Sequence, residues 1–275
     1  MQKNNFANCF DCAYISETGL VRNNNEDAAA VLAEEGCFAV ADGMGGHEGG
    51  EIASGIVVKN ISDLLTDAAV VSPGERKFAI NKALSQANGQ INNCRIVNGF
   101  SAIGSTLALL LFDPWNFSIA SVCHCGDSRV YCLRNGELFQ LTQDHNMAEV
   151  LKRSNPGNSK STAVAGNLLT RAVGIAPNIY PEWADTAVCL NDIFIVCSDG
   201  LSSVLADEEI IEAVSVDKTA ARNVDELKSR ISAAGAPDNF TVICVKILQI
   251  PPKADISGED MQESNYLLNI ANRIC

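Results

Sequence analysis

Residues Ala39–Glu51 read AVADGMGGHEGGE, in which an apolar, strand-like run delivers the carboxylate of Asp42 into a glycine-rich segment. An apolar, helix-compatible stretch begins directly afterwards at Ile52. A carboxylate beside backbone without side chains suits a metal or phosphate site, because a ligand can approach closely there. A glycine-rich turn with an incidental aspartate explains this stretch equally well when it is taken alone.

The same phrase, an apolar strand followed by Asp-Gly, recurs at Ile193–Gly200. Asp238 stands just before another strand-like run, and so do Glu26 and Asp27. Carboxylates at the ends of separate strands meet only if those strands share a sheet or face each other in a sandwich. Because carboxylates brought together out of water resist joint ionisation, such a meeting requires a cation. Oxygen ligands with few histidines favour magnesium or manganese over zinc.

Length, charge and hydrophobic content limit the classes of protein to consider. The chain has 275 residues, of which 47% are hydrophobic, enough to bury the core of one large domain or two small ones. The net charge of -13 argues against nucleic acid or an anionic membrane as a partner, since both attract basic surfaces. We find neither an apolar run near the ~20 residues of a membrane span nor a secretory signal, so a cytoplasmic protein is expected.

Eleven cysteines are scattered through the chain, many of them within apolar runs. The odd number and the absence of a signal favour buried free thiols over a disulfide framework. The cysteines expected to be buried thiols are Cys37, Cys123, Cys132, Cys189, Cys197 and Cys244. The close pair Cys9 and Cys12 lacks a second pair that would complete a four-ligand zinc site.

Hydrophobic periodicity and turn signals predict strands and helices in a mixed order. The middle of the chain, from Gly104 to Thr142, reads as an antiparallel meander of short strands. The polar segment from Asp144 to Gly166 reads as an excursion that covers a site. The expected strands cover residues 9–15, 182–189, 192–198 and 240–247, and the expected helices cover residues 52–65, 75–94, 208–214 and 219–234. Phe78 and Ile80 are expected on the buried side of the second helix.

Eight segments together resemble, in order, those of the metal-dependent serine/threonine protein phosphatases, the protein phosphatase 2C-like or PPM family, and its bacterial members in particular. These segments are Arg22 with Asn25–Asp27, Ala41–His47, Gly104–Thr106, Gly126–Arg129, Leu141–His145, Leu169–Gly174, Cys197–Leu201 and Asp238–Thr241. The resemblance implies an α+β fold, a four-layer α-β-β-α sandwich with two antiparallel sheets face to face and helix pairs outside. It also implies a phosphatase domain over residues 1–250, with a flap at about 144–166. Residues 251–275 are expected to form a tail or docking helix.

The resemblance also implies a set of metal ligands. Asp42 would bridge two Mn²⁺ or Mg²⁺ ions, and Asp199 and Asp238 would complete the protein ligands of the first. Glu26 and the backbone carbonyl of Gly43 would serve the second ion. The remaining implied roles are a weaker third ion at Asp127 with Asp199, a water held by Asp27, a position behind the ligands for Asn239, and phosphate binding by Arg22.

The implied reaction is hydrolysis of phosphoserine and phosphothreonine on proteins by a hydroxide that bridges the metals, without a covalent phospho-enzyme. The implied partners are phosphorylated proteins, including a serine/threonine kinase and its substrates. Met44 stands where many relatives have a histidine, so His47 is a candidate general acid, and Ala236 replaces a usual glycine. A hydrolase for another phosphomonoester and a catalytically silent regulatory domain are the alternatives, and the intact acidic ligands argue against the silent one.

Overall fold

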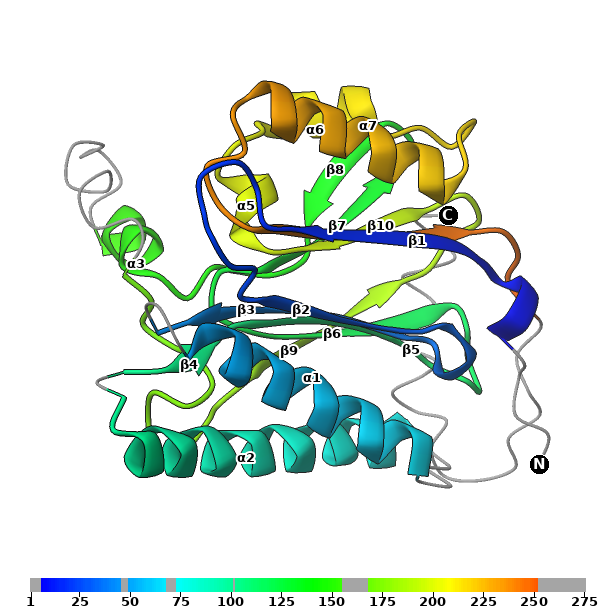
Figure 1. The fold of residues 1–275 in the computed structure, drawn as a ribbon. Helices are drawn as coiled ribbons and strands as arrows, with labels where there is room; N and C mark the ends of the chain where they lie inside the picture. Colours follow the sequence, from blue (N-terminus) through cyan, green and yellow to red (C-terminus); the bar gives the residue numbers. More distant parts are fainter. Residues whose placement is uncertain (1–5, 46–48, 68–72, 101, 155–167, 252–275) are drawn as a thin grey trace.

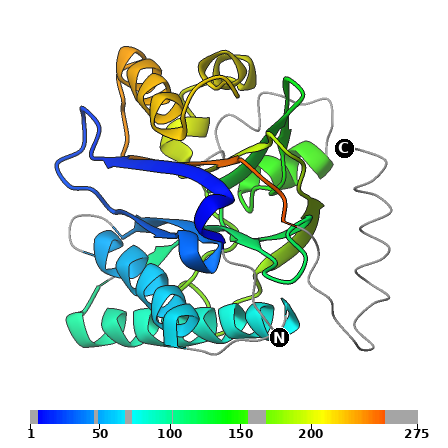
Figure 2. The ribbon, with the colours of Figure 1, turned by 90° about the vertical axis from the view of Figure 1, so that its right-hand side faces the viewer.

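Two antiparallel sheets pack face to face in the computed structural model, with helices on both outer faces (Figure 1). The structure describes residues 6–45, 49–67, 73–100, 102–154 and 168–251. Seen from the side turned by 90°, the four layers remain distinct (Figure 2). The predicted α-β-β-α arrangement is therefore confirmed.

The first sheet joins the two ends of the folded chain. Its strand order is β1 (Phe10–Glu17), β11 (Phe240–Ile247), β10 (Ile193–Cys197), β7 (Arg129–Arg134) and β8 (Glu137–Gln140). β1 pairs with β11 along its whole length, from Phe10 opposite Ile247 to Glu17 opposite Phe240. This pairing brings the loop after β1 beside the residues that precede β11.

The second sheet contains the glycine-rich stretch at the end of one of its strands. Its strand order is β2 (Asp27–Leu32), β3 (Cys37–Met44), β5 (Leu107–Phe112), β6 (Ile119–Cys125) and β9 (Glu182–Ala187), with β4 (Gly104–Ser105) paired to the end of β3. In the β2–β3 ladder Asp27 lies directly opposite Asp42. The register therefore places two carboxylates side by side.

A pair of helices covers each outer face (Figure 1). α1 (Gly50–Asp67) and α2 (Pro73–Asn98) lie on the second sheet, and α6 (Asp207–Ala213) and α7 (Ala220–Ala233) lie on the first. The short elements are η1 (Phe6–Asn8), η2 (Ala33–Glu35), α3 (Met147–Ser154) and α5 (Asp199–Ser202). None of the helices among the described residues is both long and apolar enough to span a membrane.

The sequence of β5 reflects its burial between two layers. Leu107, Leu109 and Leu111 belong to the core beneath α1 and α2, whereas Ala108 and Leu110 belong to the core between the sheets. Both faces of the strand are buried, so its sequence is continuously apolar instead of alternating.

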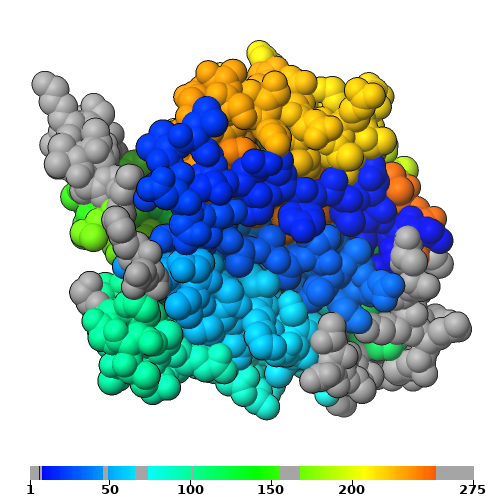
Figure 3. Space-filling model, in the orientation of Figure 1, coloured from blue at the N-terminus to red at the C-terminus, as the bar shows by residue number. Residues whose placement is uncertain are grey.

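Figure 3 shows the edge of the sandwich, where β1 lies between α7 above and α1 below.

Several predicted elements differ from the structure. The helix expected at residues 75–94 extends from Pro73 to Asn98, and Phe78, expected on its buried side, is 71% exposed. Nine of the ten cysteines in the described part of the chain are free thiols, but Cys189 is disulfide-bonded, which corrects the prediction for that residue. α3 occupies the start of the segment expected as a flap, while residues 155–167 and the tail from 252 onward lie outside the described residues. The division at residue 250 stays a prediction.

Candidate metal centre

The predicted acidic residues meet at one end of the sandwich, where β3 ends and α5 begins (left in Figure 1). Asp42 comes from the second sheet, and Asp199 follows β10 of the first. The two carboxyl groups lie close enough for each to shift the pKa of the other. Ser198 Oγ also crosses between the sheets and donates to Asp27 Oδ2 at 2.7 Å. Strand ends that are far apart in sequence thus converge on one site.

Burial and mutual repulsion raise the pKa values of these carboxyl groups. The pKa of Asp42 lies well above its ordinary value, first because of burial and then because of neighbouring carboxylates that include Asp27 and Asp199. Burial raises the pKa of Asp27 to about 6 and that of Asp127 to about 7, and it also raises the pKa of Asp199. The cluster therefore cannot be fully ionised at neutral pH unless positive charge is added.

Glu26 and the carbonyl of Gly43 face a space that a glycine keeps open. A Cβ atom placed on Gly50 would lie 2.4 Å from Glu26 Oε2 and 2.9 Å from Gly43 O. One placed on Gly43 would lie 2.0 Å from Gly50 O. Both glycines are required for this close approach, so the two oxygens predicted to serve one ion do lie around a common space.

The donor set fits hard divalent cations. The acidic side chains that meet at the centre offer carboxylate oxygen, the ligand type that magnesium and manganese prefer. Asp27 Oδ1 is buried and has no hydrogen-bond partner among the described residues, which leaves an acceptor for a water in the site. An unpaired buried acceptor and a cluster of carboxylates with raised pKa values are both features that bound cations would satisfy.

Arg22 lies at the rim of the centre, in the loop between β1 and β2. Its Nη2 donates to Asp238 Oδ2 at 2.7 Å, and its side chain is 56% exposed. The loop is anchored by a hydrogen bond from Leu20 N to Ala236 O at 2.9 Å. Ala236, noted above as a replacement for glycine, adopts a φ of 35°, in the left-handed region that favours glycine.

Asn239 ties together the loops that carry the site. Its Oδ1 accepts from Glu26 N at 2.9 Å, and its Nδ2 donates to Thr18 O and Asn24 O, each at 2.8 Å. This side chain therefore fixes the backbone on both sides of Arg22. Its predicted place behind the ligands agrees with these contacts.

Comparison with known proteins identifies the family. The sequence model of the family described as protein phosphatase 2C matches residues 21–234. The serine/threonine protein phosphatase PstP of Mycobacterium tuberculosis is 33% identical over 261 residues, covering 90% of this chain and 48% of that protein, so the chain spans about half the length of this relative. The serine/threonine phosphatase stp of Listeria monocytogenes is 30% identical over 242 residues, covering 84% and 93%.

The solved structure of the PstP catalytic domain in complex with 2 manganese ions matches with a TM-score of 0.76 at 31% identity, covering 88% of this chain and 99% of that one. The chain belongs to the protein phosphatase 2C family. The resemblance and the fold inferred from the sequence are thereby confirmed. The assignment of single residues stays a prediction, and so does His47, which lies outside the described residues.

Two hydroxyl residues in motifs that resemble this phosphatase family support Asp42, and neither was assigned a role from the sequence. Thr106 Oγ1 accepts from Asp42 N at 2.9 Å, and Thr106 N donates to Asp42 O at 2.8 Å. Thr106 Oγ1 also lies 2.6 Å from Ser128 Oγ. Their position in two of the resembling segments was the available signal, but the contact depends on sheet register.

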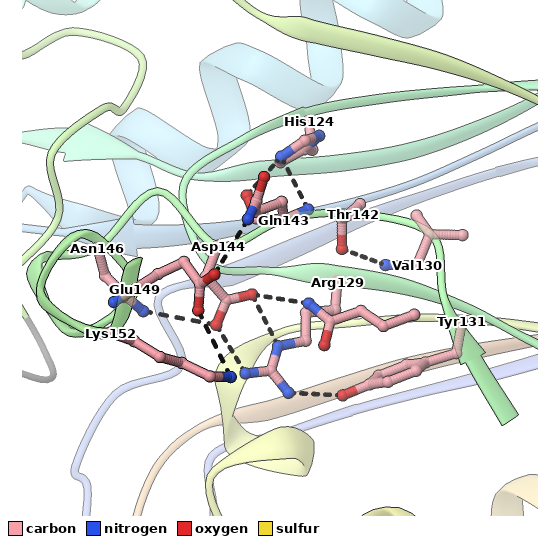
Figure 4. A network of polar contacts seen from close by, with 11 residues as sticks. His124, Arg129, Val130, Tyr131, Thr142, Gln143, Asp144, Asn146, Glu149 and Lys152 are labelled. Carbon is pink, nitrogen blue, oxygen red and sulfur yellow. Dashed lines mark hydrogen bonds and ion pairs between the residues drawn. The ribbon is translucent and has the colours of Figure 1, made fainter. Parts of the chain in front are cut away.

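A polar network joins Arg129, at the start of β7, to the residues around the start of α3 (Figure 4). Arg129 Nε and Nη2 donate to the two carboxylate oxygens of Asp144 at 2.8 and 2.6 Å. Arg129 Nη1 donates to Tyr131 Oη at 2.7 Å. Asn146 lies close enough to Asp127 to lower the pKa of its carboxyl group, against the larger effect of burial. The contacts between Arg129 and Asp144 therefore join the segment Gly126–Arg129 to the segment Leu141–His145, next to the predicted third-ion site.

Another group of possible metal ligands lies nearby and does not have metal geometry. His124, His145 and Glu182 bring ligand atoms within 4.8 Å of one another. The imidazole rings are stacked, with centroids 4.5 Å apart and planes 21° apart. A cation binds an imidazole in the plane of its ring, so two nearly parallel stacked rings cannot share one. Arg171 Nη1, 3.4 Å from His145 Nε2, already supplies positive charge.

Proposed function

We propose that this chain hydrolyses phosphoserine and phosphothreonine on proteins at the centre built around Asp42. The observation that carries the proposal is the convergence of buried carboxylates from both sheets, since their raised pKa values call for cations. The names of the relatives, serine/threonine protein phosphatases, support the substrate class. The chain spans about half the length of PstP, so the activity named for that whole protein is a proposal for this chain.

Two Mn²⁺ or Mg²⁺ ions would be held by the residues that face one another at the centre. Asp42 would contact both, Asp199 and Asp238 would hold one, and Glu26 with the carbonyl of Gly43 would hold the other. Asp127 with Asp199 would hold a weaker third. When bound, such ions offset the charge of the phosphate and lower the pKa of water. The manganese complex of the PstP catalytic domain supports the choice of metal.

The protein groups would orient the substrate and the attacking water. Arg22, exposed at the rim, would bind phosphate oxygens through its guanidinium fork. Asp27 Oδ1 would accept a hydrogen bond from water in the site. Cys197 is buried and its pKa is raised to about 12, so it is not a nucleophile at neutral pH. This supports direct attack by water without a covalent phospho-enzyme.

The partners we propose are phosphorylated proteins and the serine/threonine kinase that forms them, in the cytoplasm. The basis is the protein phosphatase activity for which the relatives are named, together with the acidic chain, which disfavours nucleic acid. His47 would be the general acid if a side chain plays that role.

The test is to compare kcat/KM of the purified chain for a phosphothreonine peptide, a nucleotide and a sugar phosphate, with increasing Mn²⁺. We expect the peptide to be preferred and turnover to cease in EDTA. Asp42→Asn is expected to lose at least ~100-fold in kcat/KM, since even residues that only support metal ligands cost 10- to 100-fold. Asp63→Asn, on the exposed face of α1 where Asp63 pairs with Lys59, is the matched control and should retain activity.

Turnover that persists after chelation, or in Asp42→Asn, would contradict the metal centre. A higher kcat/KM for the nucleotide or the sugar phosphate would replace the protein substrate with a small phosphomonoester.

A further inference from the structure

A pocket of about 510 Å³ lies at the opposite end of β7 and β10 from the metal centre. β10 runs from Ile193, beside this pocket, to Cys197, beside Asp199. Leu133 and Val214 line the pocket and are buried, whereas Leu190 and Val216 line it and are 55% and 43% exposed. The proposed phosphatase reaction uses none of these residues, so the pocket has no role in the proposed catalysis.

The last described strand ends at this pocket. Ile247 N donates to Asp192 O at 2.9 Å, and Asn191 N donates to Ile247 O at 3.2 Å. Asn191 and Asp192 both line the pocket. The chain therefore leaves the sandwich a few residues from the pocket, and residues 252–275 span up to ~80 Å when extended or ~36 Å as a helix. The segment 252–275 is therefore long enough to reach the pocket from the end of β11.

The disulfide of Cys189 also indicates that residues 252–275 reach the pocket. Cys189 lines the pocket and is disulfide-bonded. The nine other cysteines that the structure describes are free thiols. Outside the described residues the sequence has a single cysteine, Cys275.

The chemistry of the segment matches the pocket. Its apolar residues Tyr266, Leu267, Ile270 and Ile274 recur at helical spacing, so a helix formed by this segment would carry them on one face. The preceding carboxylates are Asp255, Glu259, Asp260 and Glu263.

Two ammonium groups stand beside the pocket to meet those carboxylates. Lys246 Nζ donates to the carbonyls of Val216 and Lys218, and Lys218 Nζ donates to Ala213 O at 2.9 Å. Among the described residues, these lysines contact carbonyl oxygens and form no ion pair. Their charges are therefore open to an acidic segment.

We propose that residues 252–275 dock in this pocket through the apolar face of Leu267–Ile274 and are fastened by a disulfide between Cys189 and Cys275. The bond forms when the two thiols pass two electrons and two protons to an oxidant such as hydrogen peroxide, which becomes two molecules of water. A dithiol reductant reverses the step and becomes a disulfide itself. The pocket is remote from the metal centre, so docking leaves hydrolysis of a small aryl phosphate unchanged.

The test uses the full chain, oxidised with peroxide, alkylated and digested without reductant for mass spectrometry. We expect one cross-linked peptide that joins Cys189 to Cys275 and disappears on reduction. Cys275→Ser should lose it and leave Cys189 open to alkylation, while the matched control Cys12→Ser should keep it. Leu267→Asp should slow cross-linking by about tenfold or more, because it places a charge on the apolar face that we propose docks in the pocket.

A cross-link from Cys189 to another cysteine, or a disulfide-linked dimer on a non-reducing gel, would overturn the proposal. Equal alkylation of Cys189 in oxidised wild type and Cys275→Ser would also overturn it. An unchanged cross-linking rate in Leu267→Asp would overturn docking through the apolar face. None of these outcomes depends on phosphatase activity, so this proposal and the proposed function can fail separately.

Discussion

Replacing the hydroxyl of Thr106 tests how Asp42, the predicted ligand of both metal ions, is positioned. Thr106→Val keeps the shape of the side chain and the bond from Thr106 N to Asp42 O. It removes the acceptor of Asp42 N, at 2.9 Å, and the partner of Ser128 Oγ, at 2.6 Å. Thr106 and Ser128 are both buried, so water cannot replace the lost contacts. The change therefore leaves one backbone donor and one hydroxyl without partners.

Each buried polar group that loses its partner costs about 1–3 kcal/mol. Ser128 can turn its hydroxyl, so we expect Thr106→Val to lower the free energy of unfolding by about 2–4 kcal/mol in total. For a chain of this size, that lowers Tm by roughly 4–16 °C. The assay is urea denaturation in EDTA, which separates the stability of the fold from the binding of metal.

Thr106→Ser is the matched control because it restores the hydroxyl while removing a methyl group. It should recover most of the lost stability and the Mn²⁺ affinity measured by calorimetry. Thr106→Val with the same unfolding free energy and Mn²⁺ affinity as Thr106→Ser would refute the role assigned to this hydroxyl.

Three further predictions follow from the site and its surroundings. Without metal, the free energy of unfolding should fall as pH rises from about 4 to 7, by up to ~1.4 kcal/mol per pH unit per group. The reason is that the folded pKa values of Asp27 (about 6) and Asp127 (about 7) exceed the ordinary 3.8, so the folded state binds more protons than the unfolded state. Tm measured against pH in EDTA checks this, and saturating Mn²⁺ should remove the fall. Gly50→Ala, whose Cβ would lie 2.4 Å from a carboxylate oxygen, should weaken Mn²⁺ binding at least ~10-fold by calorimetry, whereas Gly55→Ala on the same helix, with nothing within 4 Å, should not. Asp192→Asn leaves the guanidinium of Arg134 buried without its carboxylate and should cost ~3–5 kcal/mol in urea denaturation with kcat/KM unchanged.

The sequence predicted most clearly those features that repeat within a short window. The final strand is expected at residues 240–247, and the structure has it at Phe240–Ile247. It could be predicted because a dense apolar run follows a turn. Phe78 was placed wrongly because it is apolar, although it stands two residues before Ile80 and so on the opposite side of a helix. Strict use of the helical period would have placed it outside.

Features that depend on register between distant strands could not be predicted from the residues alone. Thr106 meets Asp42 only because β3 and β5 pair with one particular register. The bidentate contact of Arg129 with Asp144 likewise depends on the path of the β7–β8 hairpin. The disulfide of Cys189 was missed because compartment and an odd cysteine count are statistical arguments, which carry no information about a single residue.

The carboxylates at the centre destabilise the fold that brings them together. Asp27 and Asp42 are placed opposite each other by strand pairing, so neither can move away without breaking the ladder. The repulsion is therefore retained, and the metal-free protein relieves it by taking up protons, as the raised pKa values of Asp27 and Asp127 show. A cation that enters must displace those protons, which makes its affinity rise with pH through the same range. If the cluster holds divalent cations as proposed, rigid strand register and neutral supports such as Thr106 convert this electrostatic strain into affinity for them.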